Sequence, residues 1–130
     1  MRALPENVKS LLRKPCFAHL ATLMPDGGPQ VSPVWIDVDG DTILVNSASG
    51  RVKDKNMRHD ARVALSITDP ENPYSAVMIR GRVVEITTEG ADAHIDAMAK
   101  LYMGKDRYPL RQPGEERVLY KIEADSIATM

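Results

Sequence analysis

Cysteine is nearly absent from the sequence: Cys16 is the only one among 130 residues, so no internal disulfide can form. This scarcity fits a reducing compartment, and we expect a cytoplasmic protein. Long apolar runs are also missing, since no segment approaches the about 18 apolar residues that a membrane-spanning helix needs. The opening stretch MRALPENVKSLLRKP lacks the apolar core of a signal peptide. We therefore predict no contact with a membrane.

An excess of charge of either sign is missing as well. The 17 Lys and Arg residues nearly cancel the 18 Asp and Glu residues, which leaves a formal net charge of -1. A chain with this balance is not a general electrostatic binder of nucleic acid, and its one basic run lacks interleaved aromatic residues. Any binding of anions must therefore be local.

Common catalytic and metal-binding signatures are not found either. The sequence contains no G-x-S-x-G, no P-loop and no G-x-G-x-x-G after a predicted strand. His19, His59 and His94 fall on different predicted elements, and one cysteine cannot complete a metal cluster with them. We interpret the histidines as surface or structural residues and Cys16 as a small strand residue that faces the core. No metal site is expected.

Apolar alternation and turn residues predict a mainly β (α+β) chain that forms a single domain over residues 1–130. Strands are predicted over 16–23, 29–38, 42–46, 62–68, 76–87 and 117–124, and short helices over 5–12, 49–60 and 89–104. Residues 69–75 are predicted to form a loop. Successive strands without alternating helices favour an antiparallel barrel or an α+β fold over a parallel sheet.

Four residues give local detail to this prediction. Pro33 cannot donate a ladder hydrogen bond, so its strand is irregular or lies at an edge. Gly81 indicates a bulge or bend within a long strand. In the last helix, Thr88 is a candidate N-terminal cap and Gly104 a candidate left-handed terminator.

Basic residues gather where the third predicted strand leads into a helix. Arg51, Lys53 and Lys55 alternate there, next to the neutral donors Asn46 and Ser47. A helix N-terminus adds free N–H groups and partial positive charge, so the corner suits a phosphate. The alternative is a solvated helix face, on which the Lys and Arg residues are balanced by Asp54 and Asp60.

A second candidate is the stretch QVSPVWID, residues 30–37. The irregular strand at Pro33 would leave backbone groups free for the edge of a flat heterocycle, and Trp35, the only tryptophan, would pack near such a ring. The alternative is that Trp35 belongs to the core or to a dimer interface.

Taken together, these stretches resemble the pyridoxamine-5′-phosphate-oxidase-like split β-barrel family. The pattern is ATLMPDGGPQVSPVWIDVDGDTILVNSA, then GRVKDKNMRHDARVALSI, then DPENPYSAVMIRGRVV, and it covers about residues 17–122. The later LYMGKDRYP is similar to the subgroup that uses the deazaflavin coenzyme F420. The resemblance implies a six-stranded antiparallel split barrel that forms a homodimer, with two cofactors in grooves between the subunits.

The resemblance also implies roles for single residues. Arg51 and Lys53 would hold the cofactor phosphate, with Lys55 and Asn56 close by, and Asn46 and Ser47 would lie near the phosphate and the ribityl chain. Gln30, Ser32, Pro33 and Val34 would border the ring system, while Tyr74 and Met78 would form a wall supplied by the other subunit.

The expected function is an F420-dependent oxidoreductase that transfers a hydride between the reduced coenzyme and an unsaturated small organic substrate. The alternatives are an FMN-dependent oxidoreductase on the same fold, or a non-catalytic protein that binds flavin, deazaflavin or haem. Vitamin B6 oxidation is not expected, because the chain lacks the longer C-terminal segment of true pyridoxamine-phosphate oxidases. No catalytic acid or base is assigned; Tyr74, Tyr102 and Tyr108 are open alternatives for a proton donor.

Overall fold

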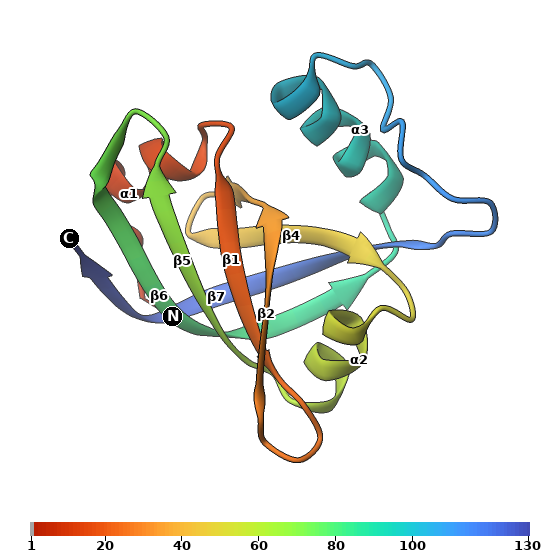
Figure 1. Ribbon diagram of the computed structural model, residues 1–130, viewed down its shortest axis with the longest axis horizontal. Helices are drawn as coiled ribbons and strands as arrows, with labels where there is room; N and C mark the ends of the chain where they lie inside the picture. Colours follow the sequence, from red (N-terminus) through yellow and green to blue (C-terminus); the bar gives the residue numbers. More distant parts are fainter. Residues whose placement is uncertain (1) are drawn as a thin grey trace.

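A single antiparallel sheet organises the computed structural model, which describes residues 2–130 (Figure 1). Its strands are β1 (Phe17–Leu23), β2 (Pro29–Trp35), β3 (Asp37–Asp39), β4 (Thr42–Ala48), β5 (Arg62–Asp69), β6 (Asn72–Thr87) and β7 (Arg117–Thr129). The helices are α1 (Glu6–Leu12), α2 (Val52–His59) and α3 (Ala91–Met103). In Figure 1, α2 and α3 lie on the side where β4 ends, and α1 lies at the other end of the molecule.

The order of strands explains how the sheet closes on itself. The order is β2-β1-β5-β6-β7-β4-β3, so the two edge strands are neighbours in the sequence, separated only by Ile36. At Ile36 the chain stops pairing with β1 and begins to pair with β4. The Ile36 N–H leaves the ladder and donates to Tyr102 Oη at 3.1 Å, while Tyr102 Oη donates to the Cys16 carbonyl at 2.7 Å. The predicted split barrel is confirmed.

The switch of pairing partner at Ile36 also explains why the number of strands differs from the prediction. The strand expected over 29–38 is two strands that share one run of chain, so the sheet has seven strands where six were predicted. Residues 69–75 are not a loop, as β5 runs to Asp69 and β6 begins at Asn72. Asp69 Oδ1 accepts the Glu71 N–H at 2.9 Å, which stabilises a tight turn between the strands. The turn replaces the predicted loop.

Two residues that were singled out in the strands behave as predicted. Pro33 lies on the edge strand β2 opposite His19, where its missing N–H interrupts no interior ladder. The register between β6 and β7 shifts between Arg80 and Gly81. A Cβ at Gly81 would lie 2.3 Å from the Glu123 carbonyl oxygen, so only glycine fits this close approach.

The core fills the inside of the curled sheet. Its largest fully buried apolar members come from five of the strands (β1, β4, β5, β6 and β7), from α1 and from the junction at Ile36: Val8, Leu12, Leu20, Ile36, Ile43, Val45, Ile67, Ile79, Val118, Tyr120 and Ile122. Cys16 is buried among them, as predicted, with Sγ directed at the Leu11 carbonyl, and burial raises the pKa of its thiol. A thiol in this state is a weak nucleophile.

Two of the three predicted helix starts, those of the second and third helices, are wrong. The second helix begins at Val52 and not at Ser49 or Gly50, because the Ser49 N–H pairs with the Glu116 carbonyl at 2.9 Å. The third helix begins after Gly90, and the Thr88 side chain does not cap it. Its predicted end is confirmed, since Gly104 adopts a left-handed conformation there.

Across residues 2–130, we find no helix of the length and apolar character needed to cross a membrane.

Candidate functional site

A cavity of about 300 Å³ lies between α3, the start of α2 and strands β2 and β4. Its walls are Phe17, Pro33, Val34, Trp35, Asn46, Ser47, Arg51, Lys53, His94, Ile95, Met98, Tyr108, Leu110 and Arg117. The cationic residues come from α2, its N-terminus and the start of β7. The aromatic residues come from β1, β2 and the loop that follows α3. The cavity thus combines a positive end with a flat apolar wall.

Lys53 defines the positive end. Its side chain is partly buried, and it makes no ion pair with any of the residues from 2 to 130. Burial lowers the pKa of Lys53, and the neighbouring positive charges of Arg51 and Arg117 lower it further. An ammonium group in this position gains from any anion that enters the cavity.

Arg117 brings a third cation from the far end of the sequence. Its side chain is 3% exposed, its Nε donates to Asn46 Oδ1 at 3.0 Å, and its guanidinium lies 5.0 Å from the centre of the Tyr108 ring. Among residues 2–130, Glu115 is the only carboxylate that forms ion pairs with these three cations. It lies 3.1 Å from Arg51 Nη2 and 3.2 Å from Arg117 Nη1. Arg117 is therefore fixed by neutral and charged neighbours together.

Two buried polar groups on the cavity wall have no hydrogen-bond partner within the described part of the chain. They are the Ser47 hydroxyl and the Arg117 Nη1 amino group. Buried polar atoms are nearly always hydrogen-bonded in folded proteins. Arg117 Nη1 is offset by its ion pair with Glu115 at 3.2 Å, whereas the Ser47 hydroxyl has no such neighbour and is the group that a ligand would satisfy. Both can donate, which suits the oxygens of a phosphate. The residues present therefore fit the phosphate of a flavin-type cofactor.

His94 joins α3 to the sheet above this cavity. Its Nε2 lies 3.0 Å from Asp37 Oδ2 and its Nδ1 lies 3.1 Å from Asn46 Nδ2. Burial alone would raise the pKa of Asp37, but hydrogen bonds from His94 and from the Val38 N–H hold it below its usual value. The chain Asp37–His94–Asn46–Arg117 thus fixes the amide that orients Arg117.

The aromatic wall is built around Trp35. Its ring stacks on Tyr102 with a centroid distance of 4.8 Å and an interplanar angle of 20°. Tyr108 meets Trp35 edge-on at 5.9 Å, and Phe17 meets Tyr102 at 6.3 Å. Trp35 is therefore part of the cavity wall, and its packing against a cofactor ring stays a prediction.

Asp54 anchors the backbone next to Lys53. Its side chain is 3% exposed and accepts hydrogen bonds from the Gly50 N–H at 2.9 Å, from Arg58 Nε at 2.9 Å and from Tyr120 Oη. These donors outweigh burial and hold the pKa of Asp54 below its usual value. The carboxylate keeps the corner that leads into α2 in one conformation.

Comparison with known proteins agrees with this architecture. A model of the pyridoxamine 5′-phosphate oxidase family matches residues 4–130. The chain belongs to this family. A solved structure named F420 reductase is 31% identical, with a TM-score of 0.83, and the match covers 96% of this chain and 98% of that one. No curated protein sequence matches the chain.

More distant structures share the fold of the family. HupZ of Group A Streptococcus is 22% identical, with a TM-score of 0.69 over 98% of this chain and 94% of its own. A conserved hypothetical protein of Mycobacterium tuberculosis is also 22% identical, with a TM-score of 0.74 over 97% of this chain and 84% of its own. At these identities the likeness concerns the fold alone.

The structure brings together half of the residues that the family resemblance singled out. Pro33, Val34, Asn46, Ser47, Arg51 and Lys53 all line the cavity. The other six do not: Gln30, Ser32, Lys55, Asn56, Tyr74 and Met78. The role of each in cofactor binding stays a prediction.

The six outlying residues have different surroundings. Asn56 is buried and donates to Thr22 Oγ1 at 3.0 Å, and Thr22 Oγ1 also lies 3.1 Å from Gln30 Oε1. Lys55 is exposed on the outer face of α2. Tyr74 is 83% exposed and Met78 38% exposed on β6, outside the cavity.

The alternative of a solvated helix face holds for the outer part of the basic corner. Arg58 pairs with Asp54 within α2, and Arg62 pairs with Asp60 through two side-chain hydrogen bonds. Arg58 and Arg62 are therefore engaged in ion pairs on the protein surface, whereas Arg51 and Lys53 line the cavity.

Sequence reasoning missed His94, Glu115 and Arg117. No local signal marks them: Arg117 reaches the site because β7 pairs with β4, where its partner is Ala48. The single signal was composition, since His94 is one of only three histidines in the chain.

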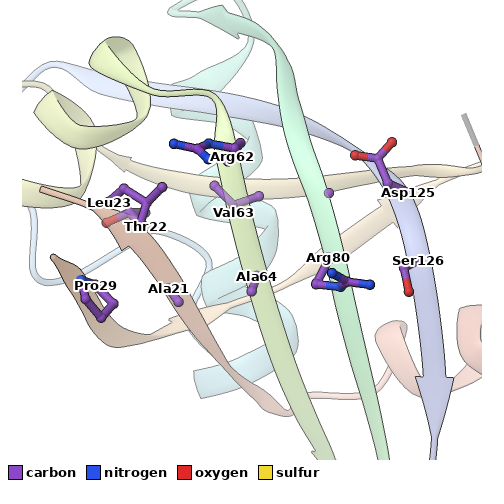
Figure 2. Close-up of a pocket in the computed structure, with 11 residues that line it drawn as sticks. Ala21, Thr22, Leu23, Pro29, Arg62, Val63, Ala64, Arg80, Asp125 and Ser126 are labelled. Atoms are coloured by element: carbon purple, nitrogen blue, oxygen red, sulfur yellow. The ribbon is translucent and has the colours of Figure 1, made fainter. Parts of the chain in front are cut away.

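A larger hollow of about 540 Å³ lies on the outer face of the sheet. Figure 2 shows its centre, where Ala21, Ala64, Arg80 and Ser126 stand side by side on four neighbouring strands. This groove combines small residues with the charged Arg62, Arg80 and Asp125, and no helix lies over it (Figure 1). No three His, Cys, Asp or Glu side chains cluster as a metal site would require, at least over residues 2–130.

Proposed function

We propose that this protein is an F420-dependent oxidoreductase that transfers a hydride between the reduced deazaflavin and an unsaturated small organic substrate. The observation that carries the proposal is the unpaired Lys53 on the wall of a cavity that also holds Trp35. The similarity to an F420 reductase over nearly the whole chain supports the choice of coenzyme.

The chain's own residues would bind and orient the coenzyme. Arg51, Lys53 and Arg117 would hold its phosphate together with the Ser47 hydroxyl, and the backbone at Pro33 and Val34 would border its ring system. When bound, the coenzyme supplies the hydride chemistry. The aromatic wall would exclude water and hold the acceptor flat against the ring, which is how positioning accelerates such a transfer.

We also propose that the protein acts as a homodimer, with a second copy seated on the outer groove of the sheet. Small residues such as Ala21, Ala64 and Gly81 on the floor of the groove permit close approach of another sheet, and Val31 and Met78 remain 62% and 38% exposed beside it. Tyr74 and Met78 would then reach the cofactor of the partner subunit.

An FMN-dependent oxidoreductase is the second candidate, because the same cationic end would accept the more highly charged phosphate monoester of FMN. The test is a titration of the purified protein with F420 and with FMN, followed through the fluorescence of Trp35, the only tryptophan. Tight binding of F420 with weak binding of FMN is expected. The reverse preference would transfer the proposal to FMN.

Turnover distinguishes an enzyme from a carrier. Reduced F420 is mixed anaerobically with a panel of planar unsaturated acceptors, and its oxidation is followed optically. We expect oxidation that depends on both protein and acceptor. Binding without turnover across the panel would support the non-catalytic alternative, and binding of neither cofactor would overturn the proposed function.

A further inference from the structure

Glu115, in the loop that precedes β7, does not line the cavity but contacts two of the cations that do. Its side chain is only 6% exposed, and its two oxygens approach different arginines: Oε1 lies 3.1 Å from Arg51 Nη2 and Oε2 lies 3.2 Å from Arg117 Nη1. The turn is fixed locally, because the Glu115 N–H donates to the Gln112 carbonyl at 3.1 Å. The carboxylate is therefore held behind both guanidinium groups, where its charge offsets theirs.

The contact with Arg117 is an ion pair without a hydrogen bond. Neither Glu115 Oε2 nor Arg117 Nη1 has a hydrogen-bond partner in residues 2–130, although the two atoms are close. A carboxylate that served only to fix Arg117 would be expected to align with it, since bidentate alignment is the strong geometry for this pair. Toward Arg117, Glu115 thus acts through its charge, whereas its Oε1 accepts a hydrogen bond from Arg51 Nη2 at 3.1 Å.

The balance of charge at this end is simple. Arg51, Lys53 and Arg117 are three cations, and Glu115 offsets one of them. A singly charged phosphodiester and a doubly charged phosphate monoester respond differently to that carboxylate, because Coulomb energy is proportional to the charge of the ligand. Repulsion by Glu115 therefore acts about twice as strongly on the monoester as on the diester.

We propose that Glu115 is a specificity-determining residue of this site, which selects phosphodiesters over phosphate monoesters by limiting the positive charge that the ligand meets. The inference rests on the proposed function, because it assumes that the cavity binds the phosphate of a flavin-type cofactor. It adds a reason why one chain of this fold would discriminate between two cofactors with similar rings.

The test compares FMN, a monoester, with riboflavin cyclic phosphate, a diester that carries the same ring. Each is titrated against the wild-type protein and against Glu115→Gln, which keeps the shape of the side chain and removes its charge. We expect affinity to rise about tenfold for FMN and about threefold for the cyclic phosphate. The Coulomb energy is twice as large for the doubly charged FMN phosphate, so its fold-change in affinity is the square of the fold-change for the singly charged diester. Riboflavin, which has no phosphate, should show no change.

Two control variants accompany it. Glu116→Gln makes the same change at the neighbouring exposed residue and should leave the ratio of the two affinities unchanged, because solvent screens that charge. Glu115→Asp keeps the charge and should keep the wild-type preference. A thermal unfolding curve for each variant confirms that it is folded.

Several results would overturn the inference. Equal gains for both ligands, no gain, or loss of binding in Glu115→Gln would show that Glu115 supports the arginines and does not select the ligand. Those results leave the proposed function intact as long as the wild-type protein binds F420 or FMN. If the wild-type protein binds none of the cofactors, the proposed function fails and the inference fails with it.

Discussion

The groove on the sheet and the cavity under α3 differ in a way that their sizes do not predict. The groove is larger, at about 540 Å³, but of its two cations Arg62 is paired with Asp60 and Arg80 is exposed to solvent. The cavity under α3 is smaller, at about 300 Å³, yet it holds an unpaired Lys53 and an unpartnered Ser47 hydroxyl within the described residues. Unsatisfied chemistry, and not volume, therefore distinguishes the candidate ligand site from a candidate protein contact.

The largest expected effect comes from a substitution at Asp54, which disrupts the turn that leads into α2 beside the cavity. Asp54→Asn should lower the free energy of unfolding by about 2 to 4 kcal/mol, because the Gly50 N–H, Arg58 and Tyr120 all donate to this buried carboxylate. Chemical denaturation measures it. Asp39→Asn, at an exposed carboxylate of β3, is the control and should change stability by less than about 0.5 kcal/mol.

The same variant predicts a change with pH. Because hydrogen bonds hold the pKa of Asp54 below the usual 3.8, its contribution to stability is present above about pH 4 and is lost as pH falls through the lower, folded-state pKa. Asp54→Asn should therefore show a shallower loss of unfolding free energy between about pH 4 and pH 2 than the wild type. An unchanged slope would assign the acid sensitivity to other carboxylates.

The second effect distinguishes a lysine that lines the cavity from a lysine on the surface nearby. Lys53→Ala should weaken cofactor binding by about 1 to 3 kcal/mol, the scale of a lost hydrogen bond to a charged group. Lys55→Ala removes the same side chain two residues away, on the exposed face of α2, and should alter the affinity by less than about 0.5 kcal/mol. Titration of both variants with F420 and FMN measures this. Equal losses would place the phosphate outside the cavity.

The smallest effect concerns the groove. Ala64→Glu places a charge at its centre, opposite Ala21 and Arg80, and a carboxylate buried against a second copy should weaken self-association about tenfold or more. Val84→Glu, at an exposed position of β6 outside the groove, should leave the dimer unchanged. Light scattering over a range of concentrations gives the molar mass. A monomeric wild-type protein would contradict the proposed dimer directly.

What the sequence could predict was local. Arg51 and Lys53 were recognisable because they lie next to each other at a strand-to-helix junction, and both do line the cavity. The edge position of Pro33 and the close approach at Gly81 followed from what proline and glycine permit in a strand. The split barrel followed from the order of the strands, together with the family resemblance.

What it could not predict depends on distant pairing. Arg117 meets Asn46 across 71 positions of sequence, and His94 meets Asp37 across 57. The boundary at Ile36 depends on the hydroxyl of Tyr102, which arrives from a helix far along the chain. The second helix begins later than predicted because the Ser49 N–H pairs with the carbonyl of Glu116, which extends the pairing between β4 and β7 by one residue. No local propensity encodes this contact.

The break at Ile36 has a consequence for self-association of the protein at high concentration. Because β2 and β3 are successive pieces of one run of chain, they form the two edges of the sheet, and the β3 edge has only three residues. On β2, Pro29 and Pro33 have no N–H to offer an incoming strand. A sheet with such margins is a poor template for the edge-to-edge stacking that starts aggregation, so its exposed faces, and not its edges, are the surfaces left for association.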